Sequence, residues 1–434
     1  MTDTQTPPVS VDLMRTLDEK HMATSLAFEA MHTAGVFVVD GAPLTQADGS
    51  IDRDRVIAAV TQSMGRIPEL GKRLMPSPLG LTAPAWVPDE DYDIAQHVHF
   101  ADGIDDLTPE SIKRLAGVNR PPLARNKPLW DMTVTRLNDG DIACGFRLHH
   151  VVGDAKWAFD SLTLVTDPDP VPEPTPESTP VRAPRTSLTI PVHAAVAWVR
   201  EQPSLRAGWA EYWRKPIVKR AKRMGGRNTR FLKEWVIRRK NLRESYLPPT
   251  TVTFFSLDAS TSARAAAKLR GSLNDLLVAA AMRAVDDDDL GIDVFVPVSR
   301  RTKHDRQIRN HVLLTRVHGA PGVELTELVP EVRRQVVAFS RGTEIETMPE
   351  GRAIGYATIV PWADHKRYLA GAEVRNLIAL PASDPRDEFS VFASTYEGVL
   401  NVTVAGRAEL DVQRSADRLQ QLIEDLAANR KAAE

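Results

Sequence analysis

The chain has 434 residues, of which 42% are hydrophobic and 26% charged, and its formal net charge is -2. These values are ordinary for a soluble globular protein of two or three domains, of which we favour two, and they give no global attraction to nucleic acid. The single cysteine, Cys144, excludes an internal disulfide and any zinc site that needs several thiolates, so we expect a reducing, cytoplasmic setting.

Neither the start of the chain nor its apolar runs predict a secretory or membrane-spanning segment. Residues 1–21 lack a basic region followed by an apolar region. The longest apolar runs, such as residues 276–282, fall far short of the roughly 20 residues needed to cross a bilayer. We therefore expect any contact with a membrane to be peripheral.

The first part of the chain predicts strands and one hairpin. Residues 34–40 and 141–150 are short apolar segments bounded by turn residues, which favours strands. Residues 130–148 read as a hairpin, because apolar positions lie on both sides of the turn sequence NDGD. The second strand of this hairpin would end at a pair of histidines. The start of residues 13–32 is more helix-like.

A proline-rich stretch divides the chain. Residues 167–187 alternate proline with acidic and small polar residues, and proline removes backbone donors and stiffens the chain. We expect a semi-rigid linker here, between an N-terminal domain over residues 1–166 and a C-terminal domain over residues 188–434.

The second part mixes helices and strands. A capping pattern, Ser272 followed three residues later by Asp275, precedes an apolar helix. Together the elements indicate an α/β or α+β fold. Helical spacing appears at 193–202, 204–215 and 415–428, and strands are predicted at 251–257, 293–299, 311–317, 389–394 and 399–406.

The sequence FRLHHVVGDA, residues 146–155, carries the strongest chemical signal. A histidine can accept and return a proton near neutral pH, so we select His150 as a general base and His149 as the neighbour that shapes the backbone. Asp154 lies too far along the turn for an obvious hydrogen bond to the ring, and pairing with an arginine is at least as plausible for it. Alternatively, the histidine pair is polar surface at a strand end and Asp154 a turn residue. Metal binding is the weakest reading, since adjacent histidines do not easily ligate one ion.

The segment HHVVGDA, residues 149–155, resembles the HHxxxDG motif of the CoA-dependent acyltransferase superfamily. Further segments resemble, in the same order, the bacterial wax ester synthase/diacylglycerol acyltransferase family within it. They are residues 14–40 with an aspartate and a Met-His pair, residues 84–100, the Pro-Leu-Trp sequence at 128–130, the Asn-Asp pair at 274–275 and the arginine-bearing segment at 294–301.

This resemblance implies an α/β fold of two similar domains of the chloramphenicol acetyltransferase-like type. Each would be a mixed sheet flanked by helices, with a tunnel between the domains that holds the histidine motif. It implies His150 as the base and a structural pairing of Asp154 with Arg301 or, less favoured, Arg300. The residues expected at the substrates are Asn274, Asp275, Trp130 and Asn376, although a core role for Trp130 and a capping role for Asp275 are at least as well founded.

The implied reaction moves a fatty acyl group from acyl-CoA, as co-substrate, to diacylglycerol or a long-chain alcohol, without a metal or other cofactor. Two positions depart from the family pattern. Ala155 replaces the motif glycine, and the later family sequence Asn-Val-Pro-Gly-Pro appears only as NLIALP, which keeps Asn376 and Pro381. These changes keep two alternatives open: an acyltransferase for another hydroxyl or amine, as in polyketide-associated or condensation-type relatives, and a lipid-binding paralogue with impaired turnover.

Residues 206–243 carry a local excess of lysine and arginine, with Trp209, Trp213 and Trp235 interleaved. Such a stretch suits anionic lipid headgroups or the phosphates of CoA, so a peripheral contact with a membrane or lipid droplet is predicted. The alternative is a solvated helical face. No nucleic-acid recognition motif accompanies the charge, and DDDD at 286–289 lacks the spacing of a calcium loop.

Overall fold

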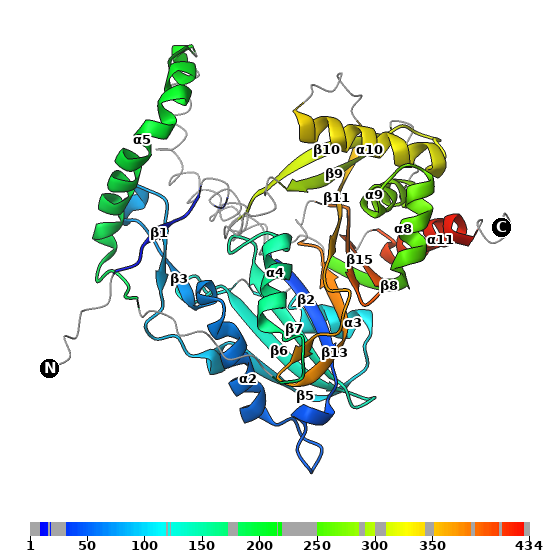
Figure 1. The fold of residues 1–434 in the computed structure, drawn as a ribbon, viewed down its shortest axis with the longest axis horizontal. Coiled ribbons are helices and arrows are strands. Elements are labelled where there is room, and N and C mark those ends of the chain that lie inside the picture. The colour runs from blue at the N-terminus through cyan, green and yellow to red at the C-terminus, as the bar shows by residue number, and fades with distance from the viewer. Residues whose placement is uncertain are drawn as a thin grey trace.

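Two six-stranded mixed sheets form the body of the molecule, and helices cover their faces (Figure 1). The predicted fold class is confirmed. The computed structural model describes residues 9–15, 18, 32–118, 120–121, 123–171, 181–214, 216–218, 250–285, 291–299, 310–342, 351–382, 387–407 and 410–428.

The first sheet contains the predicted hairpin. Trp130 pairs with Leu148, and Arg136 pairs with Ile142. Only β5 and β6 are parallel in this sheet. In sheet order the strands are β12 (Tyr368–Leu369), β13 (Ala372–Leu380), β2 (His32–Val39), β7 (Ile142–His149), β6 (Trp130–Leu137) and β5 (Val98–Asp105). The helices of this half are α2 (Arg53–Gly65), α3 (Pro109–Leu115) and α4 (Ala155–Val165).

The alternation of side chains along β7 builds both layers around the first sheet. Phe146 and Leu148 point to the face that α4 covers, because they line the same cavity as residues of that helix. Gly145 points to the opposite face, where an added Cβ would lie 2.3 Å from the carbonyl oxygen of Leu115 in α3. Glycine at 145 therefore lets α3 pack directly against the strand.

The second sheet confirms the five strands predicted in the second part of the chain. It also contains β11, which was not predicted and runs parallel to both of its neighbours. In sheet order the strands are β10 (Val312–Gly319), β9 (Ile292–Ser299), β11 (Arg352–Pro361), β14 (Phe389–Tyr396), β15 (Val399–Arg407) and β8 (Thr250–Asp258). The helices are α8 (Ala259–Lys268), α9 (Leu273–Ala284), α10 (Leu325–Arg341) and α11 (Val412–Ala428).

The two halves of the sequence are joined through the first sheet. Strand β13 comes from the second half of the chain but pairs with β2, and it also packs against β14 and β15. Asn401 of β15 donates hydrogen bonds to the Leu377 carbonyl at 3.0 Å and to Asn376 Oδ1 at 2.7 Å. The domain division at residues 166 and 188 stays a prediction, and the exchange of β12 and β13 shows that the first sheet draws on both sides of it.

A small sheet of β1 (Asp12–Leu13), β4 (Ala85–Pro88) and β3 (Lys72–Met75) supports the start of a long helix. Helix α5 (Ile190–Arg214) anchors its fully buried Ile190 against Met75 and Ala85 and then extends away from the body (Figure 1). The two helices predicted around Pro203 are thus one continuous helix. Residues 172–180 of the predicted linker lie outside the described residues. Short 3-10 turns occupy Ala42–Leu44, Pro68–Gly71, Pro78–Gly80, Ile94–Gln96 and Ser187–Thr189.

Helix α4 is fixed at its C-terminal end by a buried arginine from the second half of the chain. Arg367 donates from Nη2 to the carbonyl oxygen of Thr163 at 2.6 Å and to that of Thr166, and from Nε to Thr166 Oγ1 at 3.0 Å. A cation is favourable at the C-terminus of a helix, where carbonyl groups lack intrahelical partners. Arg66 adds a hydrogen bond to the Leu164 carbonyl and an ion pair with Asp167 at 2.8 Å.

We predict that Arg367→Met lowers the free energy of unfolding by about 2–4 kcal/mol, because it leaves buried carbonyl groups without their donor. Urea titration followed by circular dichroism measures the change. The matched control is Lys366→Met at the neighbouring position, where an exposed ion pair with Glu373 contributes little to stability. Equal losses in both variants would contradict the role given to Arg367.

Candidate active site

The histidine pair follows directly from the end of β7. His149 is the last residue of the strand and is buried, with its ring edge-on to that of His32 at 5.7 Å between centroids. Its Nδ1 accepts a hydrogen bond from the backbone N–H of Val151 at 3.2 Å, which holds the first turn after the strand. This placement fits the backbone-shaping role expected of His149, whereas a part for it in chemistry stays a prediction.

His32, which sequence reasoning placed only in a Met-His pair, packs beside the motif on the neighbouring strand. Burial, aided by the positive charge of Arg147, lowers the pKa of His32 to about 3. The ring is therefore neutral at physiological pH and adds no charge next to His149.

His150 begins the turn, and its Nδ1 atom is buried. Burial lowers the pKa of His150 below its ordinary value, so the ring is neutral and can accept a proton at pH 7. The polar groups of its own backbone, the charges of Asp154 and Asp18 and the side chain of Asn310 oppose that shift.

Asp154 is the N-cap of helix α4. Its Oδ1 accepts a hydrogen bond from the Trp157 N–H at 2.9 Å, while its Oδ2 accepts one from the backbone N–H of His311 at 2.9 Å. Both expected arginine partners, Arg300 and Arg301, lie outside the described residues, so that pairing stays a prediction. The capping role could have been found from the sequence, since an aspartate before an apolar helical run is an N-cap signal.

Ala155 starts α4 with an ordinary helical backbone. It is absent from the described non-glycine residues with positive φ, which are Leu79, Arg270, Ala370 and Glu397. The turn therefore does not require the conformational freedom of the glycine found in the family motif.

Residues far apart in the sequence meet beside His150. Asn310, just before β10, donates from Nδ2 to Asp18 Oδ1 at 2.6 Å and to the His150 carbonyl at 2.8 Å. The guanidinium of Arg15 lies 2.8 Å from His311 Nε2. No local sequence pattern indicated Asn310 or His311, because their role depends on a contact between the two halves of the chain.

The predicted Asn-Asp pair sits at the start of α9 and makes internal contacts. Ser272 and Asp275 form the predicted capping box, and Arg333 lies 3.5 Å from the Asp275 carboxylate. Asn274 Oδ1 accepts a hydrogen bond from the Ile359 N–H of β11 at 3.0 Å. A substrate contact for Asn274 or Asp275 stays a prediction.

Trp130 and Asn376 also hold the fold together. Trp130 is buried, donates from Nε1 to the Leu70 carbonyl at 2.9 Å and stacks on His97 at 4.8 Å. Asn376, which was identified as a retained residue of a degenerate family motif, lies within β13 and accepts hydrogen bonds from Asn401 and the Leu377 N–H. Neither side chain lines the cavity described next, so their predicted contact with substrate remains a prediction.

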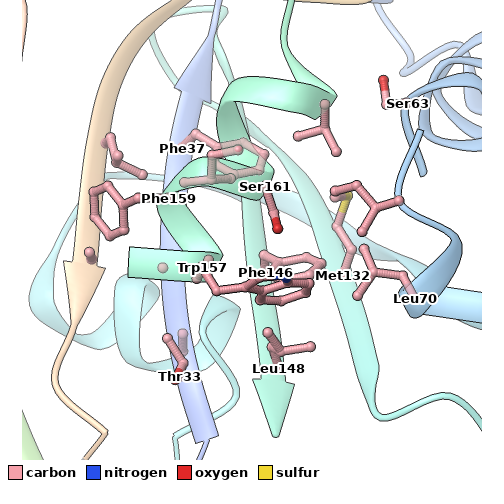
Figure 2. A pocket seen from close by; sticks show the side chains of 18 of the residues that line it. Thr33, Phe37, Ser63, Leu70, Met132, Phe146, Leu148, Trp157, Phe159 and Ser161 are labelled. Atoms are coloured by element: carbon pink, nitrogen blue, oxygen red, sulfur yellow. The ribbon is translucent and has the colours of Figure 1, made fainter. Parts of the chain in front are cut away.

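An apolar cavity lies between α4 and strands β2, β7 and β6 (Figure 2). Its unfilled space, counted together with the open solvent at its mouth, is about 820 Å3. Thr33, Ser63 and Ser161 are the only lining residues with hydroxyl groups. The lining residues nearest to His150 in the sequence are Leu148 before it and Trp157 after it. His150 itself does not line the cavity. The tunnel that would join this cavity to His150 stays a prediction.

Within the described ranges, no helix combines the length and apolar character that a membrane crossing requires. The described side chains also include no group of three or more His, Cys, Asp or Glu residues that could hold a metal ion.

Comparisons with known proteins agree with the motif and the fold. A probable diacylglycerol O-acyltransferase of Mycobacterium tuberculosis is 31% identical over 93 residues, and this match covers 20% of the chain but only 33% of that relative. The solved wax ester synthase/diacylglycerol acyltransferase of Marinobacter aquaeolei VT8 superposes with a TM-score of 0.59 at 14% identity, covering 96% of this chain and 99% of the other. A starter condensation domain of rhizomide synthetase in complex with C8-CoA gives a TM-score of 0.59 at 12% identity, with 96% and 94% covered.

Residues 14–286, more than half of the chain, match the wax ester synthase/diacylglycerol acyltransferase catalytic domain. The resemblance predicted from the motifs is confirmed: the chain belongs to the wax ester synthase/diacylglycerol acyltransferase family.

Proposed function

We propose that this protein is an acyl-CoA-dependent O-acyltransferase that moves a fatty acyl group to a lipid alcohol, either diacylglycerol or a long-chain alcohol. The observation that carries the proposal is the family motif at the end of β7, in which burial favours a neutral His150 and the cavity-lining residues Leu148 and Trp157 stand on either side of it in the sequence. A base for an alcohol and a compartment for a hydrocarbon chain are the two elements that this reaction needs.

In this mechanism Nε2 of His150 removes the proton from the acceptor hydroxyl while the oxygen attacks the thioester carbonyl carbon. The new C–O bond forms, the C–S bond breaks, and the imidazolium gives its proton to the departing thiolate. His150 is thereby restored, and the products are the ester and free CoA. The transfer moves only a proton and an acyl group, so we propose acyl-CoA as co-substrate and no resident cofactor.

The apolar lining of the cavity supports the proposal of a long-chain substrate. Its lining is almost wholly hydrocarbon, and each buried methylene group contributes about 0.8 kcal/mol to binding. Helix α4 supplies both the wall of the cavity at Trp157 and Phe159 and, through its N-cap Asp154, the anchor of the histidine turn. Helix α4 would thus set the distance between a bound acyl chain and His150.

The acceptor is proposed from the family and from the names of the relatives. Another hydroxyl or an amine, as in condensation-type enzymes, is the alternative acceptor, and loss of turnover is the alternative to an enzyme. A panel of acceptors distinguishes all three.

We further propose a cytoplasmic protein whose α5 region binds an anionic membrane or lipid-droplet surface, where lipid alcohols are dissolved. Helix α5 exposes Val192, Val196, Trp198 and Val199, and the sequence that follows it is rich in lysine and arginine. Exposed apolar and aromatic groups next to basic residues favour an interfacial lipid contact. Most of residues 206–243 lie outside the described residues, so this proposal rests on their sequence and on the exposed part of α5.

The first test is an assay with palmitoyl-CoA and either dioleoylglycerol, hexadecanol or a primary amine, following thiol release and product. We expect His150→Ala to lower kcat/KM by about 100-fold to 10,000-fold, the range for loss of a general base. His365→Ala, which removes an exposed histidine, is the control and keeps full activity. Acyl-CoA binding without thiol release in the wild type would refute the enzyme proposal.

The second test narrows the cavity. Ala158→Phe, on the cavity side of α4, is expected to lower kcat/KM for C16 substrates at least about 10-fold relative to C4 substrates, because the longer chain loses buried methylene contacts. Leu164→Phe, at an exposed position of the same helix that does not line the cavity, is the matched control. An unchanged preference for acyl-chain length would mean that the acyl chain binds outside this cavity.

The third test measures binding to vesicles of phosphatidylglycerol and phosphatidylcholine by sedimentation. The double variant Val196→Asp/Val199→Asp is expected to reduce vesicle binding at least about 10-fold, because it puts two charges on the exposed face. Val399→Asp, at an exposed position of the second sheet, is the control. Equal binding by both variants would rule out the α5 surface.

A further inference from the structure

Asn310 occupies a central position between the two halves of the chain. It is 5% exposed, and the two hydrogens of its amide nitrogen are both used: one on Asp18 Oδ1 at 2.6 Å and one on the His150 carbonyl at 2.8 Å. These contacts fix which way the amide faces, since its nitrogen must point to the two acceptors. The amide oxygen is therefore directed away from them.

That oxygen is the unusual feature. Asn310 Oδ1 is buried and has no hydrogen-bond partner among the described residues, although a buried polar atom normally has one. Asn310 is bonded to the His150 carbonyl, and its side chain favours the protonated form of the His150 ring, so this imidazole is the candidate donor for the oxygen. The His150 ring, unlike the acceptor alcohol, belongs to the protein and is present before any substrate binds.

Asp18 supplies a negative charge behind the amide. Its side chain is fully buried, and its charge and that of Asp154 both favour a protonated His150. His149 lies next to His150 in the chain, and Arg15 and His311 form a contact of their own at 2.8 Å beside the carboxylates. A neutral amide between an imidazole and a carboxylate can orient both without taking a proton from either.

We propose that Asn310 is a positioning residue for the transfer reaction, which links the buried carboxylate of Asp18 to His150 so that the second half of the chain stabilises the imidazolium formed in the reaction. This inference rests on the proposed function for its role in turnover. In it, the proton from the alcohol arrives at Nε2 of His150, while Nδ1 keeps its hydrogen and donates to Asn310 Oδ1. No proton moves to Asn310 or Asp18, and the return of the Nε2 proton to the thiolate restores the starting state.

The test uses the full-length chain and two readouts. Nuclear magnetic resonance titration of histidine labelled with carbon-13, assigned with His150→Gln, gives the pKa of His150 without any need for activity. We expect Asp18→Asn and Asn310→Leu to lower this value by about one pH unit or more, because each removes an interaction that favours the charged ring. We expect the exchange Asp18→Asn/Asn310→Asp, which moves the carboxylate next to the ring, to raise it.

Kinetics supply the second readout. For Asp18→Asn and Asn310→Leu, kcat is expected to fall about 10-fold or more while KM for palmitoyl-CoA changes less than about two-fold, and the acid limb of the pH profile moves to lower pH. Gln335→Leu is the matched control, because it removes a similarly buried amide from helix α10, away from His150 in the sequence. It is expected to lower stability without changing the titration of His150.

Two results would overturn the inference. One is the same His150 titration in Asn310→Leu, Gln335→Leu and the wild type. The other is a fall in activity that follows loss of folded protein alone. A wild-type protein that transfers no acyl group would instead refute the proposed function, and the titration would still decide whether Asn310 and Asp18 act on His150.

Discussion

The arrangement of this molecule depends on the two hydrogen bonds that the Asp154 carboxylate accepts. One comes from the first turn of α4 and the other from the backbone of His311, at the start of β10 in the second half. A carboxylate that is 1% exposed is costly unless such donors satisfy it, so the same bonds that stabilise the charge hold three segments together. The turn that carries His150 lies between β7 and this fixed point.

Helix α4 extends this contact between the two halves of the chain, because it is held at both ends. Asp154 holds its N-terminus and Arg367 its C-terminus, and both contacts reach into the second half of the chain. The helix between them forms one wall of the apolar cavity. A shift of one half against the other would therefore disturb the base and the cavity together. The pairing of β13 with β2 in the first sheet resists the same shift.

Local patterns predicted the parts of the fold that local physics determines. The β6–β7 hairpin, the strands of the second sheet and the Ser272–Asp275 capping box all follow from turn residues, alternation and caps within a few residues of each other. The pattern around Pro203 suggested a break, but α5 continues through it. The NLIALP sequence was matched only to a degenerate family motif and no strand was predicted there, yet most of it lies in β13 and pairs with β2. The contact between Asn310 and Asp18 could not be found, since the two residues are 292 positions apart in the sequence and meet only in the folded chain.

The central claim is that both halves hold the His150 imidazole where an acyl thioester and an alcohol meet. The most direct measurement is a crystal structure with a non-hydrolysable ketone analogue of palmitoyl-CoA, in which a methylene group separates the carbonyl from sulfur. We predict that the carbonyl carbon lies near His150 Nε2, with room for one hydroxyl oxygen at about 3 Å from both, and that the alkyl chain lies in the cavity between α4 and the first sheet. An analogue bound with its carbonyl remote from His150, or a His150 ring turned away from Asn310 and from the ligand, would contradict it.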